Sequence, residues 1–142
     1  MQARQDAIIE AFNRMRRESN LRHREIATTL AISEGELIAA HCGLDAGDVD
    51  SDMQATRLRP EFPAIIAATE ALGEVMALTR NESCVHEKTG VYRKISHQGP
   101  VGLVLGGSID LRLFYQQWRH AFAVQERSSK GLQQSLQFFD AS

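Results

Sequence analysis

At Leu72-Gly73-Glu74-Val75-Met76-Ala77-Leu78-Thr79-Arg80 the hydrophobic period of the chain changes from that of a helix to that of a strand. Before this point, a helix is predicted to begin near Pro60, because proline is tolerated in a first helical turn. After it, Glu74 to Arg80 is predicted to be a strand, and further strands are predicted at 83–88, 91–96 and 101–105, separated by turn residues. The middle of the chain is therefore the boundary between a helical part and a sheet.

The residues that follow these strands fit two structures. Leu111, Phe114 and Trp118 recur at helical spacing and Asp110 is placed as an N-cap, which predicts a helix over 110–118. The alternation across 109–113 also fits a strand, and this alternative stays open.

The first forty residues are predicted to be helical. Ile8, Phe12 and Met15 recur at helical spacing with charged residues opposite, so residues 3–18 form an amphipathic helix, and a shorter helix follows around Ile26. At the other end, 121–126 and 134–140 are expected to pair as antiparallel strands about a polar turn. The predicted fold class is α+β, with N-terminal helices followed by a mostly antiparallel β-sheet with an inserted helix.

A short motif near the N-terminus suggests one function to test. Ser33-Glu34-Gly35-Glu36 has the form of a capping box, and the two short helices around it are similar to a helix-turn-helix, with Arg22, His23 and Arg24 beside them. A DNA-binding regulator is therefore an alternative. It is disfavoured, because the second helix carries two glutamates and no arginine or lysine. We expect residues 1–43 to be a helical subdomain that packs on the rest.

Length and composition limit the number of domains, the kinds of partner and the location that can be expected. A chain of 142 residues is expected to form one domain, 1–142, with a helix plus antiparallel sheet over 58–142. A formal net charge of -2 gives no electrostatic reason to expect nucleic acid or anionic lipid as a partner. No apolar run approaches the roughly 20 residues of a membrane span, and no hydrophobic signal core follows the charged start, so a cytoplasmic location is expected.

Between Gly43 and Arg59 the periodicity lapses and aspartates accumulate, so this segment is predicted to be a surface connection. A calcium loop is not expected there, because no glutamate closes the spacing. The usual motifs of hydrolases, phosphate loops and zinc proteases do not occur in the chain.

Arg112 is the first candidate site residue, because leucine flanks it on both sides. A guanidinium removed from water needs an acidic partner or a bound ligand. Asp110 is the nearest structural partner. Without that pairing, Arg112 would face a pocket built from Leu113, Phe114 and Tyr115.

Cys84 and His86 form a second candidate. Two residues apart on a predicted strand, they project to the same face and are potential ligands for a soft metal or for haem iron. The structural alternative is a surface histidine beside a buried cysteine. The two cysteines, Cys42 and Cys84, are too few for a disulfide framework and are expected to be reduced.

Several blocks of sequence, together, resemble the bacterial haemin-degrading, or haemin-transport, factors of the HemS/HmuS type. They occur in that family's order: Leu72 to Glu82, Val85-His86-Glu87-Lys88, Ile109-Asp110-Leu111-Arg112-Leu113-Phe114 with Trp118, and Ser135-Leu136-Gln137-Phe138-Phe139-Asp140. The helical start, with Arg24-Glu25-Ile26-Ala27 and Ile32 to Leu37, is similar to the N-terminus of the family.

The resemblance implies a cytoplasmic haem-binding protein of haem uptake and iron acquisition. Such a protein receives haem after import and either passes it to a haem oxygenase or opens the macrocycle itself. Family members have two homologous halves with haem between them. The arginine matching Arg112 lies over one face of the haem, as a candidate catalytic residue distal to iron, and Phe114 matches an aromatic residue of that pocket. His86 matches a histidine of a secondary haem site and is a candidate iron ligand.

This chain resembles the N-terminal half only, so the principal iron-ligating histidine of the second half is missing. We expect a fragment of a longer protein. A half-length form would need His86, another histidine or a second copy of the chain as its source of a ligand, and an exposed edge strand favours homo-oligomers. Enzyme and carrier roles, with a haem importer or a haem oxygenase as partner, share the same residues. A further alternative is a structural half-domain without independent haem binding.

Overall fold

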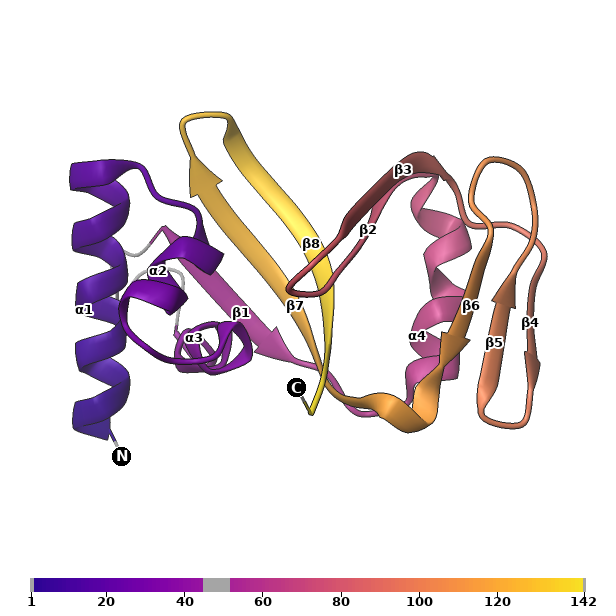
Figure 1. Ribbon diagram of the computed structural model, residues 1–142, viewed down its shortest axis with the longest axis horizontal. Coiled ribbons are helices and arrows are strands. Elements are labelled where there is room, and N and C mark those ends of the chain that lie inside the picture. Colours follow the sequence, from indigo (N-terminus) through magenta and orange to yellow (C-terminus); the bar gives the residue numbers. More distant parts are fainter. Residues whose placement is uncertain (1, 45–51, 142) are drawn as a thin grey trace. The chain divides into compact units, whose positions relative to one another are not determined.

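The computed structural model describes residues 2–44 and 52–141, and Figure 1 labels its elements. The helices are α1 (Gln2–Ser19), α2 (His23–Thr29), α3 (Glu34–Ala40) and α4 (Phe62–Ala68), with 3-10 turns η1 (Thr69–Leu72) and η2 (Tyr115–Gln117). The strands are β1 (Met53–Arg57), β2 (Glu74–Arg80), β3 (Val85–Val91), β4 (Ile95–Gln98), β5 (Val101–Val104), β6 (Leu111–Phe114), β7 (Trp118–Ser128) and β8 (Gly131–Asp140). The α+β class, with helices first and antiparallel pairing afterwards, is confirmed.

The chain divides into two compact units. Unit 1 combines the described residues as far as Arg59 with His120–Asp140, and unit 2 is Pro60–Arg119 together with Ala141. Apart from Ala141, unit 2 is thus a segment inserted between the two parts of unit 1.

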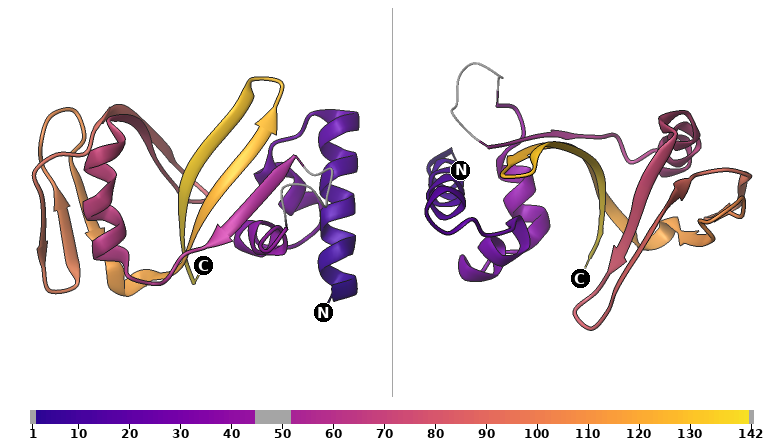
Figure 2. Two further views of the ribbon diagram at one scale, coloured as in Figure 1. Left: turned by 180° about the vertical axis from the view of Figure 1, so that it is seen from behind. Right: turned by 90° about the horizontal axis from the view of Figure 1, so that it is seen from above.

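In unit 1 the helices α1, α2 and α3 lie on one face of a sheet with strand order β1-β7-β8 (Figure 2). The prediction of a surface connection over 43–59 was wrong for its second part, because 53–57 form β1. This strand is short: Met53 and Ala55 are buried, and Gln54 and Thr56 alternate with them. The acidic segment 45–51 lies outside the described residues.

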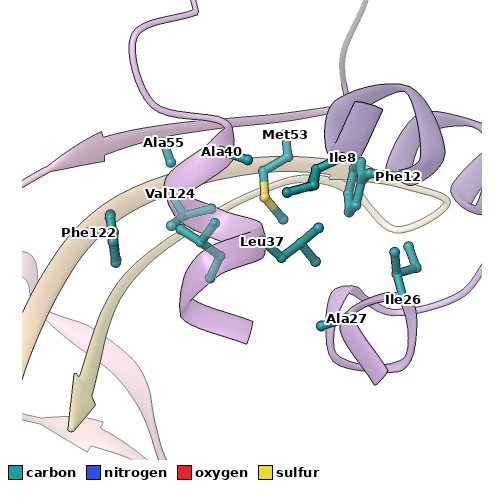
Figure 3. Close-up of a cluster of buried hydrophobic side chains, with 11 residues drawn as sticks. Ile8, Phe12, Ile26, Ala27, Leu37, Ala40, Met53, Ala55, Phe122 and Val124 are labelled. Carbon is teal, nitrogen blue, oxygen red and sulfur yellow. The ribbon is translucent and has the colours of Figure 1, made fainter. Parts of the chain in front are cut away.

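The core of unit 1 lies between these helices and their sheet (Figure 3). Phe12 and Phe122, from α1 and β7, are almost completely buried. Burial of one such side chain stabilises a fold by about 1.5–3 kcal/mol. Ser33 caps α3 as predicted, since its hydroxyl accepts a hydrogen bond from the Glu36 amide at 3.0 Å. The other members of the core cluster are Ile8, Ile26, Ala27, Leu37, Ile38, Ala40, Met53, Ala55 and Val124.

Unit 2 contains α4 and two small antiparallel sheets. The hairpin β2–β3 pairs Glu74 with Val91 at one end and Arg80 with Val85 at the other, which confirms the first predicted strand over 74–80. The second sheet has strand order β4-β5-β6.

The predicted helix over 110–118 was wrong, and the strand alternative was right. Leu111–Phe114 pairs with β5 as β6, and only 115–117 form a 3-10 turn. The physical reason is alternation: Leu113 is buried, whereas Arg112 and Phe114 on either side of it are exposed. The helical spacing of the apolar residues in this segment was coincidental.

Candidate functional site

Arg112 and Phe114 lie on the same face of β6, because they are two residues apart in a strand. Their partners across the sheet are Leu103 and Val101 of β5, whose side chains share this face. Phe114 is 56% exposed, and it is the one aromatic side chain among the exposed large apolar residues in the described part of the chain. We call these four residues the Arg112 face.

The environment of Arg112 differs from the expectation of a charge removed from water. The side chain is exposed, and its flanking leucines point to the opposite face of β6. Within the described residues it has no ion pair, with Asp110 or with any other carboxylate. Its charge is therefore available to a ligand, together with Phe114 but not with the buried Leu113 and Tyr115.

The sheet under the Arg112 face is packed against aromatic rings. Tyr115 is only 7% exposed, and a Cβ atom on Gly102 would lie 2.1 Å from its hydroxyl oxygen. That hydroxyl lies 3.3 Å from Nδ1 of His97 on β4. Burial raises the pKa of Tyr115, so the phenol is neutral. The prediction from sequence missed Gly102 and His97; the signal available was a glycine inside a strand, which often marks a close approach.

His86 lies on β3 and lines a pocket of about 260 Å³ within unit 2. The hairpin β2–β3 contributes one wall, and the segment 108–111 contributes the other. The structure places Asp110 and Leu111 in this lining, and Arg112 is not part of it. His86 and Arg112 are therefore not brought together. The complete lining is Ala77, Thr79, His86, Lys88, Ser108, Ile109, Asp110 and Leu111.

Cys84 lies in the turn before β3, where its amide donates to the Asn81 side chain at 2.9 Å. The prediction that Cys84 and His86 share one strand was therefore wrong in its boundary. Cys84 is exposed, so the alternative of a buried cysteine was wrong too. In the part of the chain that the structure describes, no three His, Cys, Asp or Glu side chains gather closely enough to hold a metal ion.

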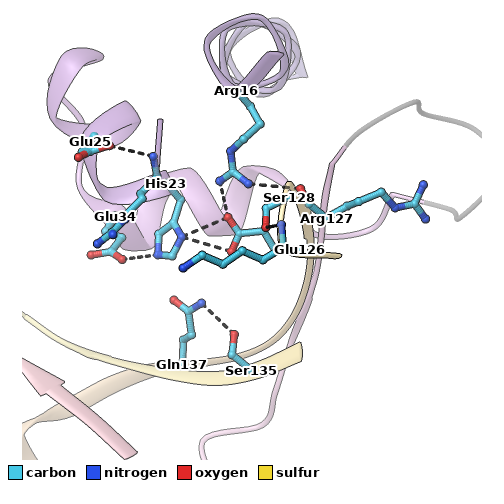
Figure 4. Close-up of polar contacts among 11 residues, drawn as sticks. Arg16, His23, Glu25, Glu34, Glu126, Arg127, Ser128, Ser135 and Gln137 are labelled. Atoms are coloured by element: carbon cyan, nitrogen blue, oxygen red, sulfur yellow. Dashed lines mark hydrogen bonds and ion pairs between the residues drawn. The ribbon is translucent and has the colours of Figure 1, made fainter. Parts of the chain in front are cut away.

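Unit 1 contains a polar network between its helices and its sheet (Figure 4). The His23 ring lies between two carboxylates, with Nε2 2.6 Å from Glu34 and Nδ1 3.4 Å from Glu126. Arg16, almost fully buried, also pairs with Glu126. Burial alone would lower the pKa of His23, but the two carboxylates outweigh it and raise this pKa to about 9.

The same network argues against the hypothesis of DNA binding. Helices α2 and α3 flank a short turn, as in a helix-turn-helix. On α3, however, Glu34 pairs with His23 and Glu36 pairs with Arg4, and the helix carries no cation. An acidic helix would be repelled by DNA phosphates. These pairs indicate a structural role for α3 in unit 1.

Comparison with known proteins identifies relatives of both units. The hemin transport protein HmuS of Yersinia pestis is 42% identical over 118 residues, which cover 82% of this chain and 32% of HmuS. The chain thus spans about a third of the length of its curated relatives. No helix within the described residues combines the length and the apolar character needed to cross a membrane.

Solved structures of related proteins agree with these sequence matches. Holo-PhuS, a heme-binding protein from Pseudomonas aeruginosa, matches with a TM-score of 0.82 and 42% identity over 96% of this chain and 38% of its own. The heme degrading enzyme ChuS of Escherichia coli O157:H7 matches with a TM-score of 0.81 and 33% identity, over 96% of this chain and 39% of its own. The family model of the haemin-degrading HemS.ChuX domain matches residues 31–142. The chain therefore belongs to the HemS/ChuX family of haemin-degrading domains.

Proposed function

We propose that the Arg112 face binds haem, and that the protein acts in haem uptake and iron acquisition inside the cell. One observation carries this proposal: an exposed phenylalanine and an arginine without an ion pair among the described residues share one face of a sheet in a HemS-type domain. Apolar surface beside a single cation suits a ligand with a wide apolar ring and carboxylate groups.

Each residue of the face has a distinct part in this proposal. Phe114, Leu103 and Val101 offer apolar contact that excludes water from the ring of the ligand. Arg112 donates charge-assisted hydrogen bonds, either to a haem carboxylate or to an oxygen ligand of the iron. Haem, when bound, supplies the iron chemistry. His86 is proposed as a separate ligand for haem iron, since it lines a different pocket.

Carrier and enzyme remain two forms of the same proposal. In the carrier form, Arg112 holds haem between a membrane importer and a haem oxygenase. In the enzyme form, Arg112 would stabilise negative charge that develops at the haem while the macrocycle is opened and iron is released. The relatives HmuS and ChuS are named for transport and for degradation, respectively.

Titration with haemin tests the binding proposal. The purified chain should sharpen and shift the Soret band of haemin. Loss of charge-assisted hydrogen bonds costs about 1.5–3 kcal/mol, so Arg112→Ala should weaken binding by roughly 10-fold to 150-fold. Phe114→Ala should weaken it through lost apolar contact. Arg14→Ala, at an exposed arginine of α1 in the other unit, is the matched control and should leave the affinity unchanged.

A free-haemin spectrum at all protein concentrations would refute binding by this chain. Equal affinities for Arg112→Ala and Arg14→Ala would refute the site. Turnover then separates the two forms of the proposal. With an electron donor, dioxygen and catalase present, loss of the Soret band together with a linear tetrapyrrole product indicates an enzyme. Transfer of intact haem to an apo-acceptor indicates a carrier.

A further inference from the structure

Four rings form a continuous row within unit 2, on the side of the β4-β5-β6 sheet opposite the Arg112 face. The ring centroids are 5.8 Å apart from His97 to Tyr115, 5.3 Å from Tyr115 to Trp118, and 5.4 Å from Trp118 to Phe62. The two pairs that involve Trp118 meet edge to face. We call these four residues the aromatic row.

Gly102 brings this row close to the Arg112 face. The Tyr115 ring occupies the space where a side chain at position 102 would lie. The neighbours of Gly102 in β5, Val101 and Leu103, direct their side chains to the opposite side and form part of the Arg112 face. At this point only the backbone of β5 therefore separates the phenol of Tyr115 from that face.

His97 gives the phenol a proton acceptor. The Tyr115 hydroxyl lies 3.3 Å from Nδ1 of His97, and a neutral imidazole can accept a proton there. Tyrosine is oxidised far more easily when its proton leaves together with the electron, and Tyr115 has a partner for that proton.

We propose that Tyr115 and Trp118 relay electrons to haem bound on the Arg112 face, with His97 holding the proton. This proposal rests on the proposed function. The relay would return electrons to the site when peroxide oxidises the bound haem, and would thereby limit oxidative damage to the residues of the Arg112 face.

The electrons and protons balance as follows. Hydrogen peroxide takes two electrons from the haem site and two protons from solvent, which yields two water molecules, and two passes of the relay, each returning one electron, restore the site. Tyr115 returns one electron and transfers its phenolic proton to Nδ1 of His97, which leaves a neutral tyrosyl radical and an imidazolium. Trp118 then supplies an electron while His97 returns the proton, so that Tyr115 is restored and Trp118 is a radical cation. A small reductant such as ascorbate reduces Trp118.

Rapid-freeze electron paramagnetic resonance tests the relay. The haem-loaded chain mixed with hydrogen peroxide should give a tyrosyl signal that Tyr115→Phe removes. The chain has one other tyrosine, and Tyr92→Phe is therefore the matched control, which should keep the signal. His97→Gln should slow formation of the radical, and imidazole added to the buffer should restore its rate. A merely structural role of His97 would not respond to imidazole.

The outcomes separate this proposal from the previous one. If Tyr115→Phe binds haemin as the unaltered chain does but keeps the full tyrosyl signal, the relay is wrong and haem binding stands. If the chain does not bind haemin, the proposed function fails and the relay to haem fails with it; photogenerated ruthenium(III) tris-bipyridine then tests, in the haem-free chain, only whether Tyr115 is the tyrosine that is oxidised beside His97. In that case Tyr115 should again be the tyrosine oxidised, and a signal lost only in Tyr92→Phe would overturn the inference.

Discussion

Gly102 has a packing constraint that the sequence does not display. A methyl group added there would overlap the Tyr115 ring, with 2.1 Å to the hydroxyl oxygen and 2.6 Å to Cζ. Overpacking of this kind costs about 1–3 kcal/mol, so Gly102→Ala should lower the free energy of unfolding by that amount. Urea denaturation measures the change.

Gly35→Ala is the matched control for this substitution. Gly35 lies inside α3, and its nearest neighbour would be the Phe139 ring at an ordinary 3.6 Å. Alanine is a better helix former than glycine, so this variant should be at least as stable as the unaltered chain. Equal effects of the two substitutions would show that contact with Tyr115 does not restrict position 102.

At the scale of elements, the network around His23 connects α2, α3 and β7. The pKa of His23 is raised from 6.5 to about 9 in the folded chain, so its stabilisation is complete below pH 6.5 and is lost as the pH rises through about 9. Burial alone would raise the pKa of Glu126, but His23 and Arg16 lower it to about 2. That contribution is complete above pH 4.5 and is lost as the pH falls through about 2.

Stability should therefore be greatest between about pH 4.5 and 6.5, and His23→Gln should remove most of the loss between pH 6.5 and 9. The raised pKa of His23 and the lowered pKa of Glu126 describe one coupled pair, so their contributions to the free energy of unfolding are not added. Together they amount to roughly 1–3 kcal/mol. Urea unfolding at several pH values measures it. An exposed histidine of the same unit, His120, serves as the control, and His120→Gln should keep the alkaline loss. An unchanged pH profile for His23→Gln would contradict this account.

The sequence predicted a long strand well, and short strands poorly. The strand over 74–80 was confirmed over all seven of its residues, in which Val75 and Ala77 are less exposed than the residues on either side of them. The strand at 111–114 has only four residues, too few to outweigh a chance helical spacing, and β1 follows an acidic run that resembles a loop. That error also concealed part of the site, since Arg112 and Phe114 share a face only in a strand.

The aromatic row could not be predicted from the sequence, for a different reason. Gly102 and Tyr115 meet only through the register of β5 with β6 and the turn that follows. No local pattern specifies either. The family resemblance, in contrast, rested on blocks spread along the chain, and the HemS.ChuX domain match over 31–142 confirmed it.

At the scale of the whole molecule, unit 2 is inserted into unit 1, so it can be deleted and the two parts of unit 1 joined directly. The chain leaves unit 1 after Arg59 and returns at His120, and these points are adjacent, since the Leu58 amide donates to the Ala121 carbonyl at 2.9 Å. Strands β1 and β7 are antiparallel neighbours there, with Arg57 opposite Phe122. A short Asn-Gly turn can join such strands. We therefore expect unit 1, with residues 60–119 replaced by Asn-Gly, to fold.

The shortened chain should unfold cooperatively in urea, because the core of unit 1 is complete without unit 2. It should also lose stability at alkaline pH as the full chain does, because the His23 network lies within unit 1. Circular dichroism measures both. Its control is the same chain with Phe122→Ala, which removes a buried ring and should lower the free energy of unfolding by about 3–5 kcal/mol. A shortened chain that unfolds without cooperativity, or that Phe122→Ala leaves unchanged, would show that unit 1 depends on unit 2 for its packing. Haemin should not bind to it, since the Arg112 face belongs to the segment removed.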